Sequence, residues 1–336
     1  MQITSRAPLR LSLAGGGTDV EPYLSQFGSK VLNFTINLFV RGLCTTDSDQ
    51  MGLKVNNIEF SSSNKRNNDI DNLFTNRLLK SLITKFPHSE LTNLNLSIQS
   101  PVSPGSGLGA SSAVVVTAIG LLTKYFEEPF DLKKISKTAW EVERIDMQVA
   151  GGFQDQYSST FGGFNLLTGN DPLDINVESI KLDDSFIREF EDSLLLVDLG
   201  ISRDGAKVIS KQIERSQEKN SQTLNALHSQ KEIVDQMMTY LISSDIKGIG
   251  ICLKEAWFAK KKFANNVSNE FIDNVHNEYL NAGAYGAKLT GAGGGGHMLI
   301  MAPRTKRNEL IELSSKLNLN LRDILITKEG FRCWNQ

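Results

Sequence analysis

The stretch of sequence that decides the fold is residues 101–113, Pro-Val-Ser-Pro-Gly-Ser-Gly-Leu-Gly-Ala-Ser-Ser-Ala. Before it, Leu94, Leu96 and Ile98 alternate with polar residues, which is the spacing of a strand. After it, an apolar run to about Phe126 predicts a helix. The glycines let backbone N–H groups turn toward an anion, and the helix adds the positive end of its dipole. The stretch therefore predicts a phosphate site, and a plain turn that caps a helix is the alternative.

Two common phosphate-binding motifs do not fit this loop. No lysine follows its last glycine, as a GxxxxGK[ST] loop requires, and the spacing is not that of a GxGxxG dinucleotide loop. A serine at the helix start can offer its hydroxyl to Mg²⁺. We predict nucleotide binding by the loop and the first helical turn, at Pro104, Gly105, Ser106, Gly107, Leu108, Gly109, Ala110, Ser111 and Ser112.

A second motif lies near the N-terminus, where residues 7–19 read APLRLSLAGGGTD. Arg10 is the one basic residue of this motif and lies in its apolar strand, and three glycines would let the chain pass close to a ligand. Asp19 can accept hydrogen bonds from sugar hydroxyls, although it can equally cap a helix over 20–27. The predicted substrate-binding residues of this motif are Gly15, Gly16, Gly17, Thr18 and Asp19.

A third motif, residues 288–301, reads KLTGAGGGGHMLIM between two predicted strands. Ordering so many glycines is entropically costly, so the run suggests backbone approach to a ligand or to another loop. A flexible hairpin is the alternative. We assign Gly293 and Gly294 to substrate binding.

Composition limits the possible functions. The 336 residues suit two domains, and a net charge of −2 argues against a nucleic-acid surface. We see no signal peptide or apolar span, which predicts a cytoplasmic protein with no membrane contact. Cys44, Cys252 and Cys333 lack metal-ligand spacing, and the four histidines form no HxxxH pair, so a zinc enzyme is not expected.

The remaining pattern predicts an α+β chain with one domain over 1–185 and a second over 186–336. A polar stretch at 61–72 predicts an exposed loop, and Asp131 is predicted to cap a helix. Further helices are predicted over 73–86, 204–243, 245–263, 268–282 and 304–316, and strands over 3–14, 31–46, 194–199 and 322–327.

Together the three motifs resemble the GHMP kinase superfamily, in that family's order and over nearly the whole chain. GGGTD, PGSGLGASSA and GGFQDQYSSTFGGFN are most similar to the sugar-kinase branch that contains D-glycero-D-manno-heptose 7-phosphate kinases. The resemblance implies a domain like ribosomal protein S5 domain 2, a ferredoxin-like C-terminal domain and a cleft between them. It also implies ATP and Mg²⁺, transfer to the anomeric hydroxyl of heptose 7-phosphate, and a role in making nucleotide-activated heptose for surface polysaccharide.

The resemblance assigns the two metal ligands and the catalytic aspartate. The glycine-loop position that coordinates Mg²⁺ matches Ser111, with Ser112 as a stand-in. The Glu-Arg pair of the next helix matches Glu143 and its neighbour, and Glu141 is the local competitor. The catalytic aspartate matches Asp155, although this chain has Gly-Phe-Gln-Asp where Ser-Gly-x-Asp is common.

The same resemblance implies which residues lie near the molecule that accepts the phosphoryl group. Arg10 matches a basic residue near the transferred phosphate, and Asp19 matches the aspartate of GEHTD that holds sugar hydroxyls in galactokinases. Where those have Gly-Glu-His, this chain has three glycines, whose bare amides would suit an anionic substituent on the acceptor. The expected partners are thus ATP and a sugar phosphate, for a monomer or homodimer.

Several alternatives stay open. The chain can be another sugar-1-kinase of the fucose type, or a kinase for an isoprenoid alcohol or amino acid, which Asp19 argues against. It can also be a non-catalytic sensor that binds sugar and ATP, although Arg10, Ser111, Glu143 and Asp155 are all retained. The polar loop near 61–66 is a guess for the adenine contacts.

Overall fold

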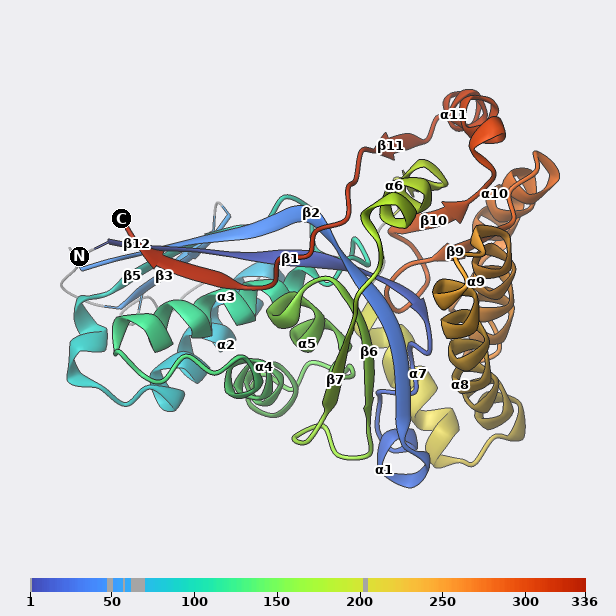
Figure 1. Cartoon of the computed structure of the whole chain (residues 1–336). Helices are drawn as coiled ribbons and strands as arrows, with labels where there is room; N and C mark the ends of the chain where they lie inside the picture. Colours follow the sequence, from blue (N-terminus) through green and yellow to red (C-terminus); the bar gives the residue numbers. More distant parts are fainter. Residues whose placement is uncertain (1, 47–50, 57, 62–69, 202–204) are drawn as a thin grey trace.

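The chain is built around two β-sheets with helices packed on them (Figure 1). A computed structural model describes residues 2–46, 51–56, 58–61, 70–201 and 205–336. Within these ranges the larger sheet has eight strands and the smaller sheet has four. None of the helices in this described part combines the length and apolar character needed to cross a membrane.

The larger sheet is organised by its two longest strands. Strand β2 pairs with one partner through its first residues and with another through its last, so the sheet branches there. All pairs in this sheet are antiparallel except β3 with β5. In spatial order the strands are β12 (Arg332–Asn335), β1 (Gln2–Ala14), β2 (Ser29–Thr45), β5 (Asn95–Gln99), β3 (Gly52–Val55) and β4 (Ile58–Ser61), with β6 (Phe164–Gly169) on β2 and β7 (Asn176–Ile180) on β6.

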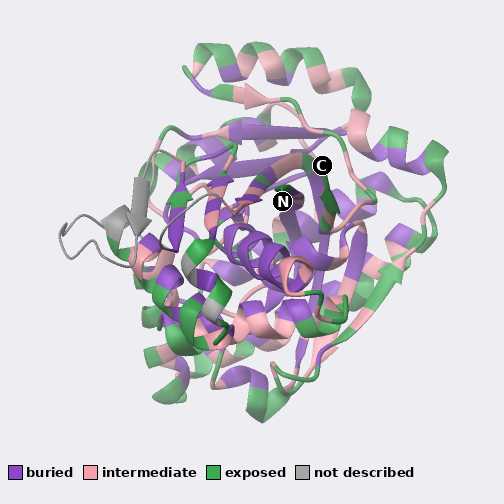
Figure 2. Ribbon diagram, turned by 90° about the vertical axis from the view of Figure 1, so that its left-hand side faces the viewer, coloured by how far each residue is buried: buried purple, intermediate pink, exposed green. Residues whose placement is uncertain are grey.

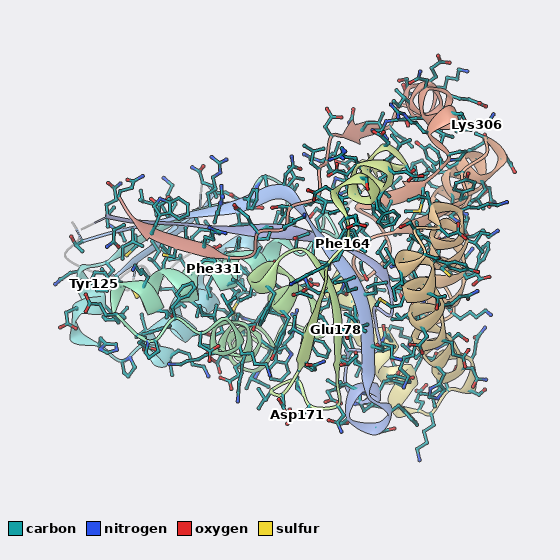
Figure 3. All side chains as sticks on the ribbon, in the orientation of Figure 1. Tyr125, Phe164, Asp171, Glu178, Lys306 and Phe331 are labelled. Carbon is teal, nitrogen blue, oxygen red and sulfur yellow. The ribbon has the colours of Figure 1, made fainter. Side chains whose placement is uncertain are left out.

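Helix α3 (Ala110–Tyr125) lies at the centre of the layer that covers this sheet, against β1 and β2. Its sequence is apolar on nearly every side, and nearly all of its residues are buried (Figure 2). Gly120 lets the ring of Phe331, labelled in Figure 3, pack directly on the helix backbone. The other helices of the layer are α2 (Ile70–Lys85), α4 (Leu132–Trp140), the π-helical turn η2 (Glu141–Asp146) and α5 (Gln154–Phe161).

The smaller sheet runs in the order β11 (Asn320–Arg322), β8 (Leu194–Asp198), β10 (His297–Met301) and β9 (Gly286–Leu289). Its two inner strands are continuous apolar runs, as expected for strands covered on both faces. Helices α8 and α9 pack on each other beside it (Figure 1). The helices of this half are α7 (Gly205–Gln217), α8 (Ser221–Ile242), α9 (Ile246–Lys260), α10 (Glu270–Asn281) and α11 (Arg307–Lys316).

Some predicted elements need correction. The single helix predicted over 204–243 is wrong, because Lys219 adopts φ 52° and the Asn220 side chain caps a new helix by accepting from the Thr223 N–H. The predicted strand at 322–327 lies earlier, at β11, and only Ile326 forms an isolated bridge. The loop predicted at 61–72 lies partly outside the described residues, and α2 already begins at Ile70.

Other elements were not predicted. They are α5, α6 (Asp184–Asp192) and the last strand, β12, which pairs with β1. Helix α1 (Tyr23–Phe27) lies within the helix over 20–27 that was the alternative for the Asp19 motif, and it is shorter than that helix. The predicted division after residue 185 stays a prediction.

Candidate active site

The glycine loop before α3 is an open turn of backbone at a helix N-terminus. Gly105, Gly107 and Gly109 have φ between 78° and 79°, a left-handed conformation that glycine adopts without strain. Gly109 is also the N-cap residue of α3. The loop is therefore shaped to place N–H groups and the helix dipole before an anion.

The third glycine motif packs against this loop. A Cβ on Gly291 would lie 2.5 Å from the Gly107 Cα, and one on Gly296 would lie 2.6 Å from the Ser106 carbonyl oxygen. His297 Nδ1 donates to the same Ser106 carbonyl at 2.8 Å, and its Nε2 accepts from Arg322 Nε at 3.0 Å. Of the alternatives for this motif, approach to another loop is the one observed.

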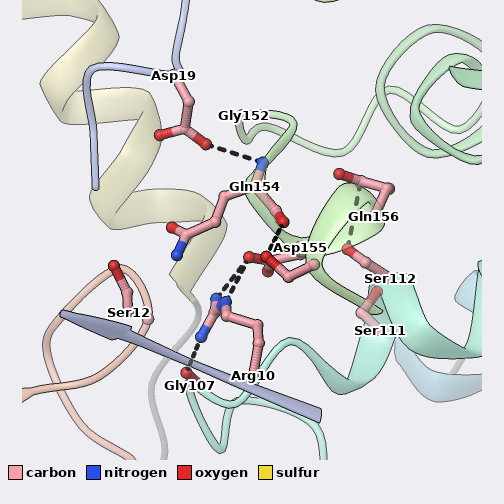
Figure 4. A network of polar contacts seen from close by, with 12 residues as sticks. Arg10, Ser12, Asp19, Gly107, Ser111, Ser112, Gly152, Gln154, Asp155 and Gln156 are labelled. Carbon is pink, nitrogen blue, oxygen red and sulfur yellow. Dashed lines mark hydrogen bonds and ion pairs between the residues drawn. The ribbon is translucent and has the colours of Figure 1, made fainter. Parts of the chain in front are cut away.

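An ion pair joins β1 to α5 beside the loop (Figure 4). Arg10 Nε and Nη2 each lie 2.7 Å from Asp155 Oδ1, and Arg10 Nη1 donates to the Gly107 carbonyl at 2.7 Å. Leu9 and Leu11 point into the core, so strand alternation turns Arg10 and Ser12 to the opposite side. A Cβ on Gly109 would contact both partners of the pair, at 3.2 and 3.5 Å.

A second acidic residue, Glu143, lies at the start of α3. Its Oε1 accepts from Ser111 Oγ at 2.8 Å, while its Oε2 accepts from Ser112 Oγ and Gln156 Nε2, each at 2.6 Å. Glu143 is 1% exposed, so these donors replace the water that a carboxylate needs. Glu141 points elsewhere and accepts from Lys85 Nζ at 2.9 Å. Ser111 and Glu143 are thus the pair that presents two oxygens at the loop.

Asp19 is buried near the Arg10–Asp155 pair. Its carboxylate accepts from the Gly17 N–H at 3.0 Å and the Gln154 N–H at 3.2 Å. Burial raises the pKa of Asp19, backbone hydrogen bonds oppose that rise, and the charge of Asp155 adds to it. The alternative that Asp19 caps a helix over 20–27 is wrong, because α1 begins at Tyr23 with Pro22 in the capping position.

Two of the three amides expected to be bare at the glycine triplet already have an acceptor, and the Gly16 amide stays a prediction. The Gly15 N–H donates to Gln230 Oε1 at 2.9 Å, and the Gly17 N–H is held by Asp19. A Cβ on Gly15 would collide with the Lys30 carbonyl, so this glycine is required by packing. The idea that these two amides bind an anionic substituent is therefore wrong.

Two cavities meet at the Arg10–Asp155 pair. The larger one, of about 420 Å³, is lined by the glycine loop, Ser111, Ser112 and Glu143, and we name it the loop cavity. The smaller one, of about 90 Å³, is lined by Asp19, and we name it the Asp19 cavity. Residues that line both are Arg10, Arg144, Asp155, Ile209, Gly291 and Ala292.

Most predicted site residues lie at these cavities, and a few do not. Thr18 is buried and donates to the Gly15 carbonyl at 2.7 Å. Leu108 belongs to the core, where its carbonyl accepts from the Arg10 N–H. Gly293 lines the loop cavity rather than the Asp19 cavity, and the Gly294 N–H donates to the Val267 carbonyl.

Sequence reasoning missed three residues that line the Asp19 cavity: Ser12, Gln154 and Lys260. Ser12 carried a signal, since it lies two residues from Arg10 on the same side of a strand. Lys260 carried none, because it is the first of three consecutive lysines at a helix end. It is nevertheless buried, and its Nζ donates to the Gly291 carbonyl.

Comparison with known proteins agrees with this geometry. Residues 73–163 match the N-terminal domain of GHMP kinases, and residues 237–318 match their C-terminal domain. The chain is 32% identical to the D-glycero-alpha-D-manno-heptose 7-phosphate kinase of Campylobacter jejuni, over 99% of this chain and 98% of that one. This chain belongs to the GHMP kinase family. As a GHMP kinase, it uses ATP to phosphorylate a hydroxyl group.

Other relatives agree on the family. A bifunctional fucokinase/GDP-fucose pyrophosphorylase of Arabidopsis thaliana is 27% identical over 88% of this GHMP kinase, which spans 29% of that protein. The crystal structure of a D-glycero-D-manno-heptose 1-phosphate kinase from Bacteroides thetaiotaomicron superposes with a TM-score of 0.77, at 26% identity and 99% coverage of both chains. The galactokinase of Lactococcus lactis, at 15% identity over 98% of this chain and 95% of its own, shares the fold with a TM-score of 0.75. The predicted family, α+β kinase fold and enzyme class are confirmed.

Proposed function

We propose that this GHMP kinase transfers the γ-phosphoryl group of ATP to the anomeric hydroxyl of D-glycero-D-manno-heptose 7-phosphate, giving the 1,7-bisphosphate. The observation that carries the proposal is the Arg10–Asp155 pair, which lines both cavities. Phosphoryl transfer depends on alignment and charge stabilisation between donor and acceptor, and this pair lies where they would meet. The substrate named for the Campylobacter jejuni relative supports the choice of acceptor.

ATP is proposed to occupy the loop cavity. Its phosphates would lie on the N–H groups of the glycine loop, before the α3 N-terminus. Away from the loop, this cavity is lined by Val55, Phe74, Val102 and Val149, an apolar surface that suits the adenine ring. The earlier guess for adenine, residues 61–66, lies almost entirely outside the described residues.

Mg²⁺ is proposed to bind Ser111 and Glu143. Ser111 Oγ and Glu143 Oε1 lie 2.8 Å apart at the wall of the loop cavity. Two hard oxygens fit Mg²⁺, which takes its other ligands from phosphates and water. Among the described residues no cluster of three or more metal-binding side chains competes with them. When bound there, the ion would supply positive charge to offset the charge of the phosphates.

Asp155 is proposed to orient the acceptor hydroxyl and take its proton. Arg10 engages Oδ1, so Oδ2 is the oxygen assigned to the substrate proton. The anomeric oxygen then forms a bond to the γ-phosphorus, while the bond from that phosphorus to the β–γ bridging oxygen breaks and ADP leaves. An anomeric hydroxyl is more acidic than an ordinary alcohol, so a carboxylate is an adequate base.

Arg10 is proposed to stabilise charge during transfer. Arg10 is 4% exposed, and its guanidinium is held from two sides, by Asp155 and by the Gly107 carbonyl. A cation fixed in a dry site needs little reorganisation as negative charge moves from donor to acceptor.

The test is ATP consumption with Mg²⁺ against heptose 7-phosphate, mannose, fucose, galactose, mevalonate and homoserine, with products mapped by phosphorus NMR. We expect turnover on heptose 7-phosphate and a new anomeric phosphate signal. Turnover on fucose alone would replace the acceptor and keep the kinase. ATP binding without turnover on any acceptor would contradict the proposed function.

A further inference from the structure

Two buried polar groups at the Asp19 cavity have no hydrogen-bond partner in the described part of the chain. They are Ser12 Oγ, from β1, and Gln154 Nε2, from α5. Both residues are 6% exposed, so they are also largely screened from bulk water. Leaving such groups unpaired costs stability, and native proteins rarely do so without a reason. Both residues line the Asp19 cavity, so a ligand bound there would supply the missing hydrogen-bond partners.

Gly16 keeps the space between these two groups open. A Cβ at this position would lie 3.2 Å from Ser12 Oγ and 3.6 Å from Gln154 Oε1. Unlike Gly15 and Gly17, Gly16 does not have a left-handed φ, so its backbone does not require glycine. Figure 4 shows Ser12 and Gln154 on the same side of the Arg10–Asp155 pair. The absence of a side chain here thus leaves room for an atom of a ligand.

Lys260 adds a cation to the same cavity from the end of α9. It is 6% exposed, and its Nζ donates to the carbonyl of Gly291, a residue that lines both cavities. The charged groups around it are Arg10, Asp19, Asp155 and Lys288. Burial, and then the charge of Arg10, lower the pKa of Lys260 to about 7, against the opposing effect of the two carboxylates. An anionic oxygen nearby would favour its charged form.

We propose that Ser12, Gln154 and Lys260 form a donor subsite that binds acceptor oxygens beside the hydroxyl to be phosphorylated. The inference rests on the proposed function. All three groups donate, whereas Asp19 accepts, and it lines the same cavity. A compound rich in hydroxyl groups can pair with the donors and with Asp19, because a hydroxyl can both accept and donate a hydrogen bond. An apolar acceptor would leave the buried donors unpaired and is disfavoured.

The experiment measures acceptor and ATP kinetics, together with Tm, for Ser12→Ala, Gln154→Leu and Gly16→Ala. We expect the KM for the acceptor to rise roughly tenfold in each, through one lost hydrogen bond in Ser12→Ala and Gln154→Leu and through a methyl group in the ligand space in Gly16→Ala, while the KM for ATP stays within about twofold. Removing an unpaired buried group should leave the Tm of the free protein unchanged or raise it. If these residues had only a structural role, the substitutions would instead lower the Tm and raise the KM for both the acceptor and ATP.

The matched control is Ser159→Ala. The Ser159 hydroxyl is also buried without a partner in the described chain, on the same helix as Gln154, but it lines neither cavity. Its removal should not change either KM. Gly17→Ala is the contrasting glycine, because φ 98° and a Cβ contact of 2.6 Å with Phe263 predict a loss of Tm.

A second readout separates this proposal from the proposed function. Acceptor binding without ATP raises the Tm by an amount that grows with the ratio of ligand concentration to Kd, and it needs no turnover. We expect heptose 7-phosphate to stabilise the wild type and to stabilise Ser12→Ala, Gln154→Leu and Gly16→Ala much less. Equal shifts in wild type and variants, or no shift of the wild type with any sugar or sugar phosphate, would overturn the subsite. Absence of turnover with these shifts retained would instead count against the kinase proposal alone.

Discussion

Arg10 and Asp155 stand 145 residues apart in the sequence, and both Nε and Nη2 of the arginine lie 2.7 Å from one carboxylate oxygen. The contact joins the first strand to helix α5 at the point where two cavities meet. Only 23% of the Asp155 side chain is exposed, so it has a defined direction of access. This arrangement makes Asp155 the first residue to test.

Replacing Asp155 should remove turnover and leave nucleotide binding almost intact. Asn is nearly isosteric but cannot take a proton, so Asp155→Asn should lower kcat by about 10²–10⁴-fold, the usual contribution of a positioned base. The Kd for ATP, measured by calorimetry, should change by less than about threefold, because the phosphates are assigned to backbone N–H groups. A variant that keeps kcat within about threefold of wild type would contradict the role of Asp155 in proton transfer.

Glu143→Gln should raise the Mg²⁺ requirement. The amide would offer a donor to Ser111, Ser112 or Gln156, all of which already donate to the carboxylate. We expect the half-saturating Mg²⁺ concentration to rise about 10–100-fold and the free energy of unfolding to fall by about 1–3 kcal/mol. Titration of activity with Mg²⁺ and denaturant unfolding measure the two effects.

Glu141→Gln is the control for this prediction. Glu141 lies in the same π-helical turn but faces Lys85 and lines neither cavity, so its Mg²⁺ dependence should match wild type. Comparison of Ser111→Ala with Ser112→Ala then shows which of the two serines is the Mg²⁺ ligand. Ser112 is buried beside Gln156, so its removal should lower the Tm more than the affinity for Mg²⁺. The same Mg²⁺ dependence for Glu143→Gln and wild type would refute the metal site.

His297 should support ATP binding through the glycine loop. Because Nδ1 donates to the Ser106 carbonyl and Nε2 accepts from Arg322, the ring is held in its neutral form. Burial is the main cause that lowers the pKa of His297. In His297→Leu the loop loses one hydrogen bond, and the KM for ATP should rise about 5–10-fold with little change for the acceptor. Equal increases for both substrates would point to a general loss of structure instead.

The motifs could be predicted from sequence because glycine spacing and strand alternation are local properties. The position of α3, its Gly109 cap and the Asp131 cap of α4 all follow from neighbouring residues. Helix α5 was missed because nearly all of its residues are buried, polar ones included, so no apolar face repeats along it. The break between α7 and α8 depends on one left-handed residue, Lys219.

The acceptor side could be predicted only in part, because its contacts join distant elements. Asp19 was identified by its motif, but its partner, the Gln154 N–H, lies 135 residues away. Lys260 has the same sequence surroundings as Lys261, yet only Lys260 is buried at the cavity. The contact of the end of α9 with Gly291 in the third glycine motif makes that difference, and no local sequence pattern predicts it.

Lys260 should make acceptor binding depend on pH. Its pKa is lowered from 10.5 to about 7, chiefly by burial, with Arg10 as the second cause. Between those two values the unfolded chain binds more protons at this residue, so its contribution to the free energy of unfolding rises with pH. Acceptor affinity should move the other way, because only the ammonium form attracts an anionic oxygen. We therefore expect the KM for the acceptor to increase as the pH rises from about 6 to about 8.5.

Lys260→Met should remove most of that pH dependence and hold the KM high throughout, whereas Lys260→Arg, which stays charged, should flatten it at a lower KM. Lys261→Met is the matched control, since Lys261 pairs with Asp273 at 3.1 Å and lines neither cavity. Its profile should follow wild type. If the KM profile of Lys260→Met keeps the wild-type slope, Lys260 does not carry the charge that the acceptor meets.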